Sequence, residues 1–100
     1  MKAVVLRVGG DLYALPVERV RRLIPFQRPR PLPSTEPSSL GLVSVRGELV
    51  AVWDLATRLG LVPHGTDVIA LVEGVAGIGF AVDGVIGVRD LPPLSPLPQG

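Results

Sequence analysis

The sequence has no cysteine, which excludes disulfide bonds, thiolate metal sites and cysteine nucleophiles. Aromatic residues make up only 4% of its 100 residues, so valine, leucine, isoleucine and alanine must fill the interior. The net charge is only +1, which argues against a partner held mainly by charge, such as a nucleic-acid duplex or an anionic membrane. The single histidine, His64, has no convergent partners in the sequence, so we expect no metal, no cofactor and no enzymatic activity.

The apolar content is sufficient for a folded domain. Apolar residues make up 47% of the chain, and the length predicts one domain over residues 1–100 with a modest core. The first residues, MKAVVLRVGGD, lack the long apolar segment of a secretory signal peptide, so we predict a cytoplasmic protein.

One apolar stretch, residues 68–88, is long enough to cross a bilayer as a helix. Against that alternative, Glu73 and Asp83 would each cost about 2.5–3.5 kcal/mol near the centre of such a helix. Its glycines and β-branched residues also suit strands better than a helix. We therefore favour two buried strands over a transmembrane helix.

The first third of the chain predicts a β-hairpin followed by a proline-rich loop. Residues 3–8 and 12–17 have strand-like composition, and Gly10–Asp11 favours a tight turn between them. Residues 17–24 have apolar residues at helical spacing, but one helical turn leading into a short strand fits equally well. Residues 25–39 contain five prolines and are predicted to form a loop.

The middle of the chain predicts a second hairpin and a short helix. Residues 41–54 read as two strands turning at Gly47–Glu48, and their apolar runs predict burial on both faces. Asp54 is a candidate N-cap for a helix over 55–61 that ends at Gly60. The remaining elements are predicted to be strands at 68–73, 78–82 and 85–89, followed by a proline-rich tail over 90–100 that is extended or disordered.

The sequence also contains a weak internal repeat with a displacement of 65 positions. This displacement places Gly9 on Gly74, residues 17–20 on 82–85, and the Pro-Leu-Pro at 31–33 on a second copy at 96–98, without gaps. We infer two copies of one unit, at about 3–62 and 67–98. The second copy lacks the closing hairpin and helix, which would begin near position 106.

Three segments in this order resemble the CheW-like domain of bacterial chemosensory systems. They are VVLRVGGDLYALPVERVRRLI, LGLVSVRGELVAVWDLATRLGL and VAGIGFAVDGVIGV, which together extend over nearly the whole chain. The second is the most specific, since the family shows a glycine, a Leu-Arg-Gly-Glu turn and a Val-x-Asp-Leu ending. Gly41, Arg46, Gly47, Glu48, Asp54 and Leu55 occupy those positions.

The resemblance implies an all-β fold of two small five-stranded Src-homology-3-like (SH3-like) barrels with one or two short helices. It also implies a non-enzymatic adaptor in chemotaxis or twitching motility. Such an adaptor links the cytoplasmic tip of a chemoreceptor to the regulatory domain of a CheA-type histidine kinase. It meets the membrane only indirectly, through its receptors. Because the second repeat is incomplete, we further predict a homodimer, or a partner, that completes the barrel.

The candidate partner-binding residues are Val20, Arg22, Gly41, Arg46 and Glu48. The resemblance places the first four on the functional surface of the family, although many members have a glutamate where this chain has Arg22. Arg46 and Glu48 are either a solvated charge pair at the turn or part of an interface. The alternative function is a small-barrel nucleic-acid-binding protein that uses the arginine-rich segment 19–30, although no nucleic acid is expected from the net charge.

Overall fold

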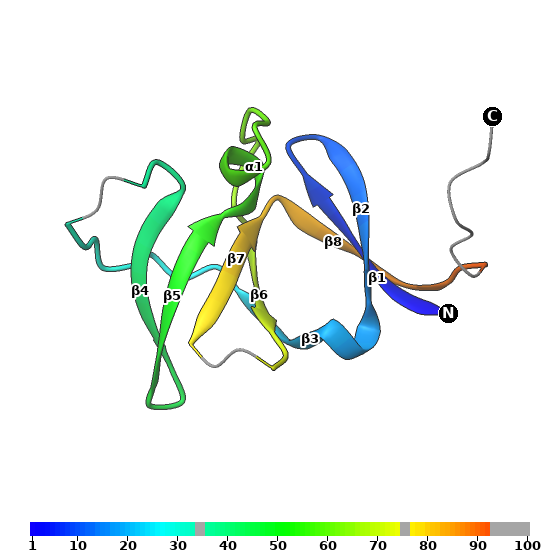
Figure 1. The fold of residues 1–100 in the computed structure, drawn as a ribbon, viewed down its shortest axis with the longest axis horizontal. Helices are drawn as coiled ribbons and strands as arrows, with labels where there is room; N and C mark the ends of the chain where they lie inside the picture. The colour runs from blue at the N-terminus through cyan, green and yellow to red at the C-terminus, as the bar shows by residue number, and fades with distance from the viewer. Residues whose placement is uncertain (34–35, 75–76, 93–100) are drawn as a thin grey trace.

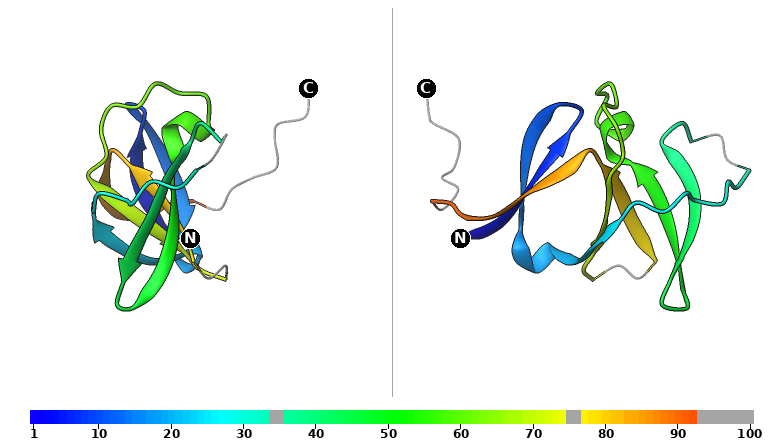
Figure 2. Two further views of the ribbon diagram at one scale, coloured as in Figure 1. Left: turned by 90° about the vertical axis from the view of Figure 1, so that its left-hand side faces the viewer. Right: turned by 180° about the vertical axis from the view of Figure 1, so that it is seen from behind.

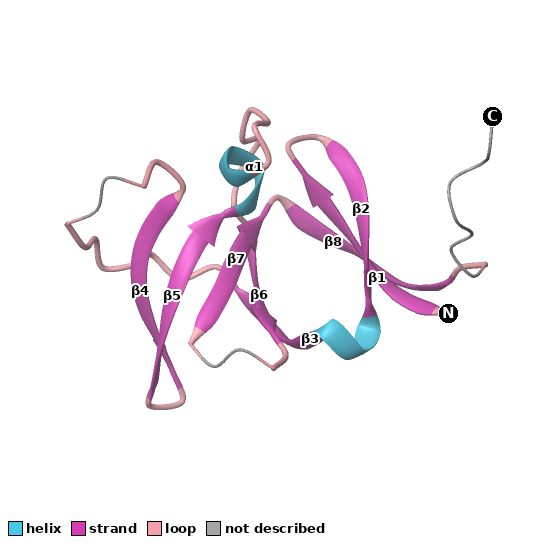
Figure 3. Cartoon of the chain, viewed as in Figure 1, coloured by secondary structure: helices cyan, strands magenta, loops and turns pink. Residues whose placement is uncertain are grey.

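The computed structural model describes residues 1–33, 36–74 and 77–92, and its fold is mainly β (Figure 1). The predicted all-β class is confirmed, with only two short helical elements between the strands (Figure 3). In chain order the elements are β1 (Lys2–Val8), β2 (Asp11–Pro16), the 3-10 helix η1 (Val17–Arg19), β3 (Val20–Pro25), β4 (Ser39–Val45), β5 (Glu48–Asp54), α1 (Leu55–Arg58), β6 (Val68–Val72), β7 (Ile78–Val82) and β8 (Gly84–Asp90).

The strands form two sheets. One has three strands in the order β2-β1-β8, and the other has five in the order β3-β6-β7-β5-β4. The three-stranded sheet lies at one end of the molecule and the β4–β5 hairpin at the other (Figure 2). Past the end of β3, Arg30 forms an isolated antiparallel bridge with Leu42 of β4. This bridge joins the loop that follows β3, one edge of the five-stranded sheet, to β4 at the other edge, which is consistent with a small barrel.

The two sheets are built from strands of both sequence repeats. The 65-residue displacement places β1, β2 and β3 on β6, β7 and β8. However, β3 pairs with β6, and β8 pairs with β1, so each repeat gives its third strand to the sheet of the other. The first repeat also gives its β4–β5 hairpin to the sheet that holds β6 and β7. The segments 3–62 and 67–98 are therefore units of sequence that do not fold as separate barrels.

Both two-residue hairpin turns have two residues with positive φ. The values are 58° and 83° at Gly9 and Gly10, and 50° and 81° at Arg46 and Gly47. Positive φ at both central residues defines the type I′ turn, whose twist matches that of the flanking strands. The predicted turn positions, Gly10–Asp11 and Gly47–Glu48, were one residue too late, because Asp11 and Glu48 already belong to β2 and β5.

The ambiguous segment 17–24 forms one helical turn followed by a strand. It contains η1 and then β3, whose residues alternate between half-buried and exposed along the strand. The alternation follows from pairing with β6 on one edge and from packing of one face against the interior. A continuous helix would lose both, so long-range pairing decides between the two local alternatives.

Two apolar clusters form the core. The first lies inside the five-stranded sheet, and the second lies between the sheets and includes Leu6, Val8 and Ala56. The predicted burial of β5 on both faces is wrong. Val50 and Val52 are buried, but Leu49, which points to the opposite face, is 65% exposed. The outer face of β5 is therefore only partly covered, since Trp53 on the same face is half-buried.

The predicted N-cap of the short helix is confirmed. The Asp54 carboxylate accepts hydrogen bonds from the backbone N–H and the hydroxyl of Thr57. Helix α1 ends at Arg58 rather than at residue 61, because Gly60 adopts a φ of 77°. The N–H groups of Gly60 and Leu61 then bond back to the carbonyls of Thr57 and Ala56, which is a Schellman ending.

The long apolar stretch 68–88 forms β6, β7 and most of β8. In the described part of the chain, no helix is long and apolar enough to cross a membrane. The predicted tail lies mostly outside the described residues, as does the second Pro-Leu-Pro of the repeat, at 96–98.

Candidate partner-binding site

Two hollows lie along the β4–β5 hairpin. The loop-side hollow, of about 520 Å³, is lined by Gln27, Arg28, Arg30, Leu42, Val43, Ser44 and Leu49. The turn-side hollow, of about 240 Å³, is lined by Arg21, Arg22, Val45, Arg46 and Glu48. Together they contain five of the nine arginines of the chain and one carboxylate, so this side of the barrel is strongly basic.

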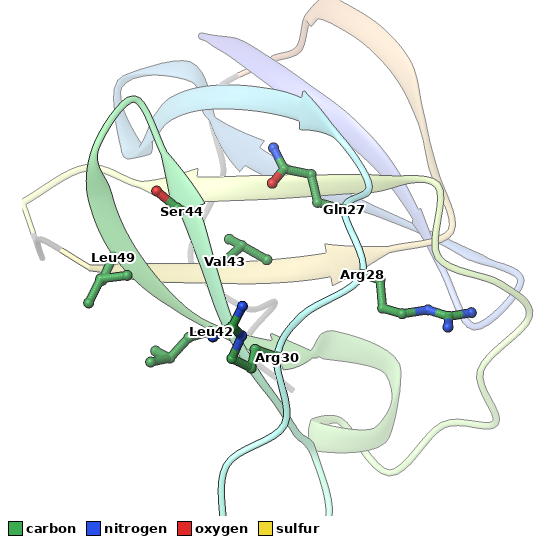
Figure 4. Close-up of a pocket in the computed structure, with 7 residues that line it drawn as sticks. All are labelled: Gln27, Arg28, Arg30, Leu42, Val43, Ser44 and Leu49. Carbon is green, nitrogen blue, oxygen red and sulfur yellow. The ribbon is translucent and has the colours of Figure 1, made fainter.

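Gly41 determines the shape of the loop-side hollow. Arg30 and Leu42 exchange two backbone hydrogen bonds, of 2.7 and 2.9 Å. A Cβ on Gly41 would lie only 2.1 Å from the Arg30 carbonyl oxygen, and Gly41 has a φ of 120°. Only glycine allows the loop to approach this closely. Gly41 therefore acts by holding Arg30 against β4, where Arg30 lies beside Leu42 (Figure 4).

The loop-side hollow also exposes polar backbone at the edge of β4. In the β4–β5 ladder, Val45 pairs with Glu48 across the two-residue turn, so the N–H and C=O of Ser44 point away from β5. Leu42, two residues earlier, uses its outward groups to bond Arg30. No backbone group of the described residues reaches those of Ser44. The hollow thus combines free hydrogen-bonding groups with the nearby guanidinium of Arg30.

An ion pair organises the turn-side hollow. Arg21 Nη2 donates to Glu48 Oε1 at 2.6 Å, between side chains that are 36% and 38% exposed. The hydrogen bond, and then the positive charge of Arg21, hold the pKa of the Glu48 carboxyl below its usual range. The same contact raises the pKa of Arg21. Since both groups are solvated, the pair contributes little to stability and serves mainly to orient the two side chains.

This ion pair corrects one reading of the turn. Glu48 pairs with Arg21 of β3 rather than with its neighbour Arg46. Arg46 is exposed at the tip of the hairpin and has no ion-pair partner within the described part of the chain. It is also the one described non-glycine residue with positive φ, at 50°. Its guanidinium is therefore free to bind a carboxylate of another molecule.

The structure brings together three of the five predicted site residues. Arg22, Arg46 and Glu48 line the turn-side hollow, and their role in partner binding stays a prediction. Gly41 is buried under the loop, and Val20 packs against the core between the sheets. Neither side chain lines the hollows, so both contribute by packing rather than by direct contact with a partner. In the arginine-rich segment 19–30, four arginines line the hollows and Arg19 does not.

Sequence reasoning missed Arg21 and Ser44 as site residues. Arg21 contacts Glu48 only because β3 crosses to the five-stranded sheet, and no local pattern reports that crossing. The outward backbone of Ser44 follows from the turn position, which a correct placement of the type I′ turn at Arg46–Gly47 would have given.

An aromatic pair lies on the outer face of the same sheet. The ring centroids of Trp53 and Phe80 are 6.4 Å apart, and the Arg58 guanidinium lies 6.0 Å from the centre of the Trp53 ring. Trp53 and Phe80 are half-buried and paired on β5 and β7. Trp53 therefore packs on the outer face of the sheet rather than inside the core, and it stays partly accessible there.

Comparison with known proteins identifies the family of this fold. The model of the CheW-like domain matches residues 2–99. The chain belongs to the CheW-like domain family. The family assignment agrees with the absence of enzymatic activity expected from the sequence, because CheW-like proteins are scaffolds and adaptors.

Two CheW proteins are similar to this CheW-like chain over part of their length. The chemotaxis protein CheW of Bacillus subtilis (strain 168) is 31% identical over 86 residues, which are 82% of this chain and 55% of that protein. The crystal structure of the scaffolding protein TtCheW from Thermoanaerobacter tengcongensis has a TM-score of 0.78 and 28% identity, over 88% of this chain and 63% of that one. The chain thus spans less than two thirds of either relative.

Proposed function

We propose that this CheW-like chain is a chemotaxis scaffold that joins a chemoreceptor tip to the regulatory domain of a CheA-type histidine kinase. Family membership supports the scaffold role, and the curated relative supports chemotaxis rather than twitching motility as the output. The observation that carries the proposal is the pair of arginine-lined hollows on the β4–β5 hairpin, which together form a surface suited to protein contact.

The chemistry of this surface suits an acidic segment of a protein partner. Arginine forms bidentate hydrogen bonds with carboxylates, and Arg46 is both exposed and unpaired in the described structure. The hydrocarbon of Leu49 adds an apolar contact beside the loop-side hollow, since its side chain is 65% exposed. A basic rim around apolar contact area is typical of a specific protein interface.

A calorimetric titration tests this function. The chain should bind the cognate kinase regulatory domain or a soluble receptor tip, and Arg46→Glu should weaken binding at least about tenfold by placing like charges together. Arg46→Gln is the matched control, because it also places a non-glycine residue at the positive φ of this position. It should lose less binding affinity than Arg46→Glu does. Arg89→Glu, on exposed β8 in the other sheet, should bind as the wild type does. Absence of binding to both proteins would overturn the proposed function.

The nucleic-acid alternative fits the site less well. Four arginines of segment 19–30 line the hollows, which favours an anionic ligand. However, none of the residues that line them is aromatic, so bases have no stacking platform there. Oligonucleotide binding with a steep salt dependence would support this alternative over the scaffold.

The proposed location is the cytoplasm, where receptor tips and the kinase meet. A homodimer is also part of the proposal. The location can be tested by fractionation of cells that express the tagged chain, in which recovery outside the cytoplasm and apart from receptors would contradict it.

A further inference from the structure

The two outer strands of the five-stranded sheet, β3 and β4, meet along a seam that backbone hydrogen bonds close only in part. Both hollows lie on this seam, with the β4–β5 hairpin on one side and segment 21–30 on the other. In the described structure a single isolated bridge, between Arg30 and Leu42, joins the two backbones across it. The seam is formed entirely by internal segments of the chain.

Ser44 carries the backbone groups that the seam leaves open. Its N–H and C=O point away from β5, as those of Leu42 do, because outward groups recur at every second residue of an antiparallel strand. Leu42 uses its groups to exchange bonds of 2.7 and 2.9 Å with Arg30. No backbone group within residues 1–33, 36–74 and 77–92 bonds those of the exposed Ser44. The pairing along this edge therefore stops at Leu42, and the next outward position is open.

The open position at Ser44 suits a peptide backbone better than a simple anion. Ser44 presents a donor and an acceptor side by side, and the bridge at Leu42 shows that one peptide residue bonds both groups at once. A phosphate or an ionised carboxylate offers only acceptors, so it would leave the Ser44 carbonyl without a partner. Addition of an extended peptide to a sheet edge satisfies both groups.

The charges beside the seam favour an acidic peptide. Arg28 and Arg30 line the loop-side hollow, and none of the residues that line it is acidic (Figure 4). At the turn, Arg46 has no ion-pair partner in the described part of the chain. Guanidinium groups bind carboxylates through paired hydrogen bonds. A segment that lies along β4 between Arg30 and Arg46 therefore meets positive charge at both ends.

The alternation of side chains along β4 further defines the peptide. Val43 and Val45 line the hollows from the inner face of β4, where both belong to the core cluster. A residue that pairs with Ser44 points to the outer face, which Arg30 shares because it is paired with Leu42. Its two neighbours point toward the valines. Alternating acidic and apolar residues therefore fit the seam.

We propose that an extended acidic segment of a protein partner adds to the edge of β4, where one of its residues exchanges two backbone hydrogen bonds with Ser44. The segment runs antiparallel to β4, as the chain does at Arg30, and places its carboxylates toward Arg30 and Arg46. Arg30 already occupies the position opposite Leu42, so the segment continues from Ser44 toward the turn. The identity of this partner rests on the proposed scaffold function.

A second copy of the chain is a poor occupant of this edge. Antiparallel pairing of Ser44 with its own equivalent would bring Arg46 of one copy opposite Leu42 of the other. That position is already bonded to Arg30, so the two arginines would be forced together. Like charges at this distance oppose association.

A titration with the peptide Glu-Val-Glu-Val-Glu, blocked at both ends and followed by the amide signals of the protein, tests the docking. The Ser44 signal should shift, and its hydrogen exchange should slow about tenfold at ten times the dissociation constant. The Leu42 amide is already bonded to Arg30 and should change little. The blocked peptide Lys-Val-Lys-Val-Lys should have no effect. Absence of any change at Ser44 up to about 5 mM acidic peptide, or equal effects of the two peptides, would overturn the proposal.

Two backbone changes separate strand addition from attraction of charge alone. Ser44→Pro removes the outward N–H without breaking a bond to β5, and it should weaken peptide binding about tenfold. Ser44→Ala keeps the N–H and should bind the peptide more tightly than Ser44→Pro does. N-methylation of the central glutamate of the peptide removes the donor to the Ser44 carbonyl and should cause a similar loss with the unmodified protein. This second test does not depend on the folding of the proline variant. Equal affinity for the plain and the N-methylated peptide would overturn strand addition.

The peptide experiments use neither the kinase nor a receptor, so their outcome is separate from that of the scaffold function. Absence of binding to both of those proteins would overturn the function. Failure of the peptide experiments, with binding to either protein retained, would overturn only this mode of docking.

Discussion

The two sheets of this protein use the same strand–turn–strand unit in different surroundings. In the five-stranded sheet, β6 and β7 are covered by β3 on one side and by β5 on the other, and a loop bridge brings the edges together. In the three-stranded sheet, β1 and β2 have β8 on one side, and no strand of the described residues lies on the other. The comparison shows that the β4–β5 hairpin supplies the strand beside β7, and that no described strand takes the matching place beside β2.

The largest expected effect concerns the bridge between the loop after β3 and strand β4. Gly41→Ala places a Cβ 2.1 Å from the Arg30 carbonyl oxygen at a φ of 120°, so it should lower the free energy of unfolding by about 3 kcal/mol. Gly47→Ala is the control, because its Cβ meets open space at a φ of 81°, and should cost about 1 kcal/mol. Equal losses in urea denaturation would contradict the role of the bridge.

A smaller effect is expected at the junction between the sheets. The buried Asp83 accepts a hydrogen bond from the Gly10 N–H at 2.9 Å, and its own N–H bonds the Arg7 carbonyl. Asp83→Ala should cost about 2 kcal/mol, since it removes a bond to a charged acceptor. Asp83→Asn keeps an acceptor oxygen and should lose less. Identical losses for the two variants, measured by thermal unfolding, would show that the hydrogen bond does not hold the turn.

The smallest effect is the pH dependence of the ion pair between β3 and β5. The pKa of Glu48 is lowered in the folded state, so its contribution is complete above the ordinary value of 4.5 and is lost as the pH falls through the lower folded value. The Glu48→Gln variant should therefore lose less of its free energy of unfolding than the unmodified chain as the pH falls below about 4.5. Near neutral pH the two proteins should have similar stability. A loss of stability that begins above pH 6 in the unmodified chain would point to other groups.

Local chemistry predicted the features that depend on a few neighbouring residues. Asp54 caps α1 as predicted, and Gly60 ends its last turn, because side chain and backbone meet within a few positions. The exchange of β3 and β8 between sheets could not be predicted, since it depends on pairing over long separations. For the same reason Arg21, rather than Arg46, is the partner of Glu48. The sequence indicated the arginine-rich segment that lines the hollows, but it did not predict which arginine pairs with Glu48.

Amide hydrogen exchange at Ala14 and Gly79 is the most direct test of the central claim that β5 covers the edge of β7 and that no described strand covers the matching edge of β2. These amides are equivalent in the repeat, and only Gly79 lies beside a strand, β5, on that side. In dilute solution Gly79 should be protected at least about a hundredfold more than Ala14. Equal protection of the two amides would contradict the account.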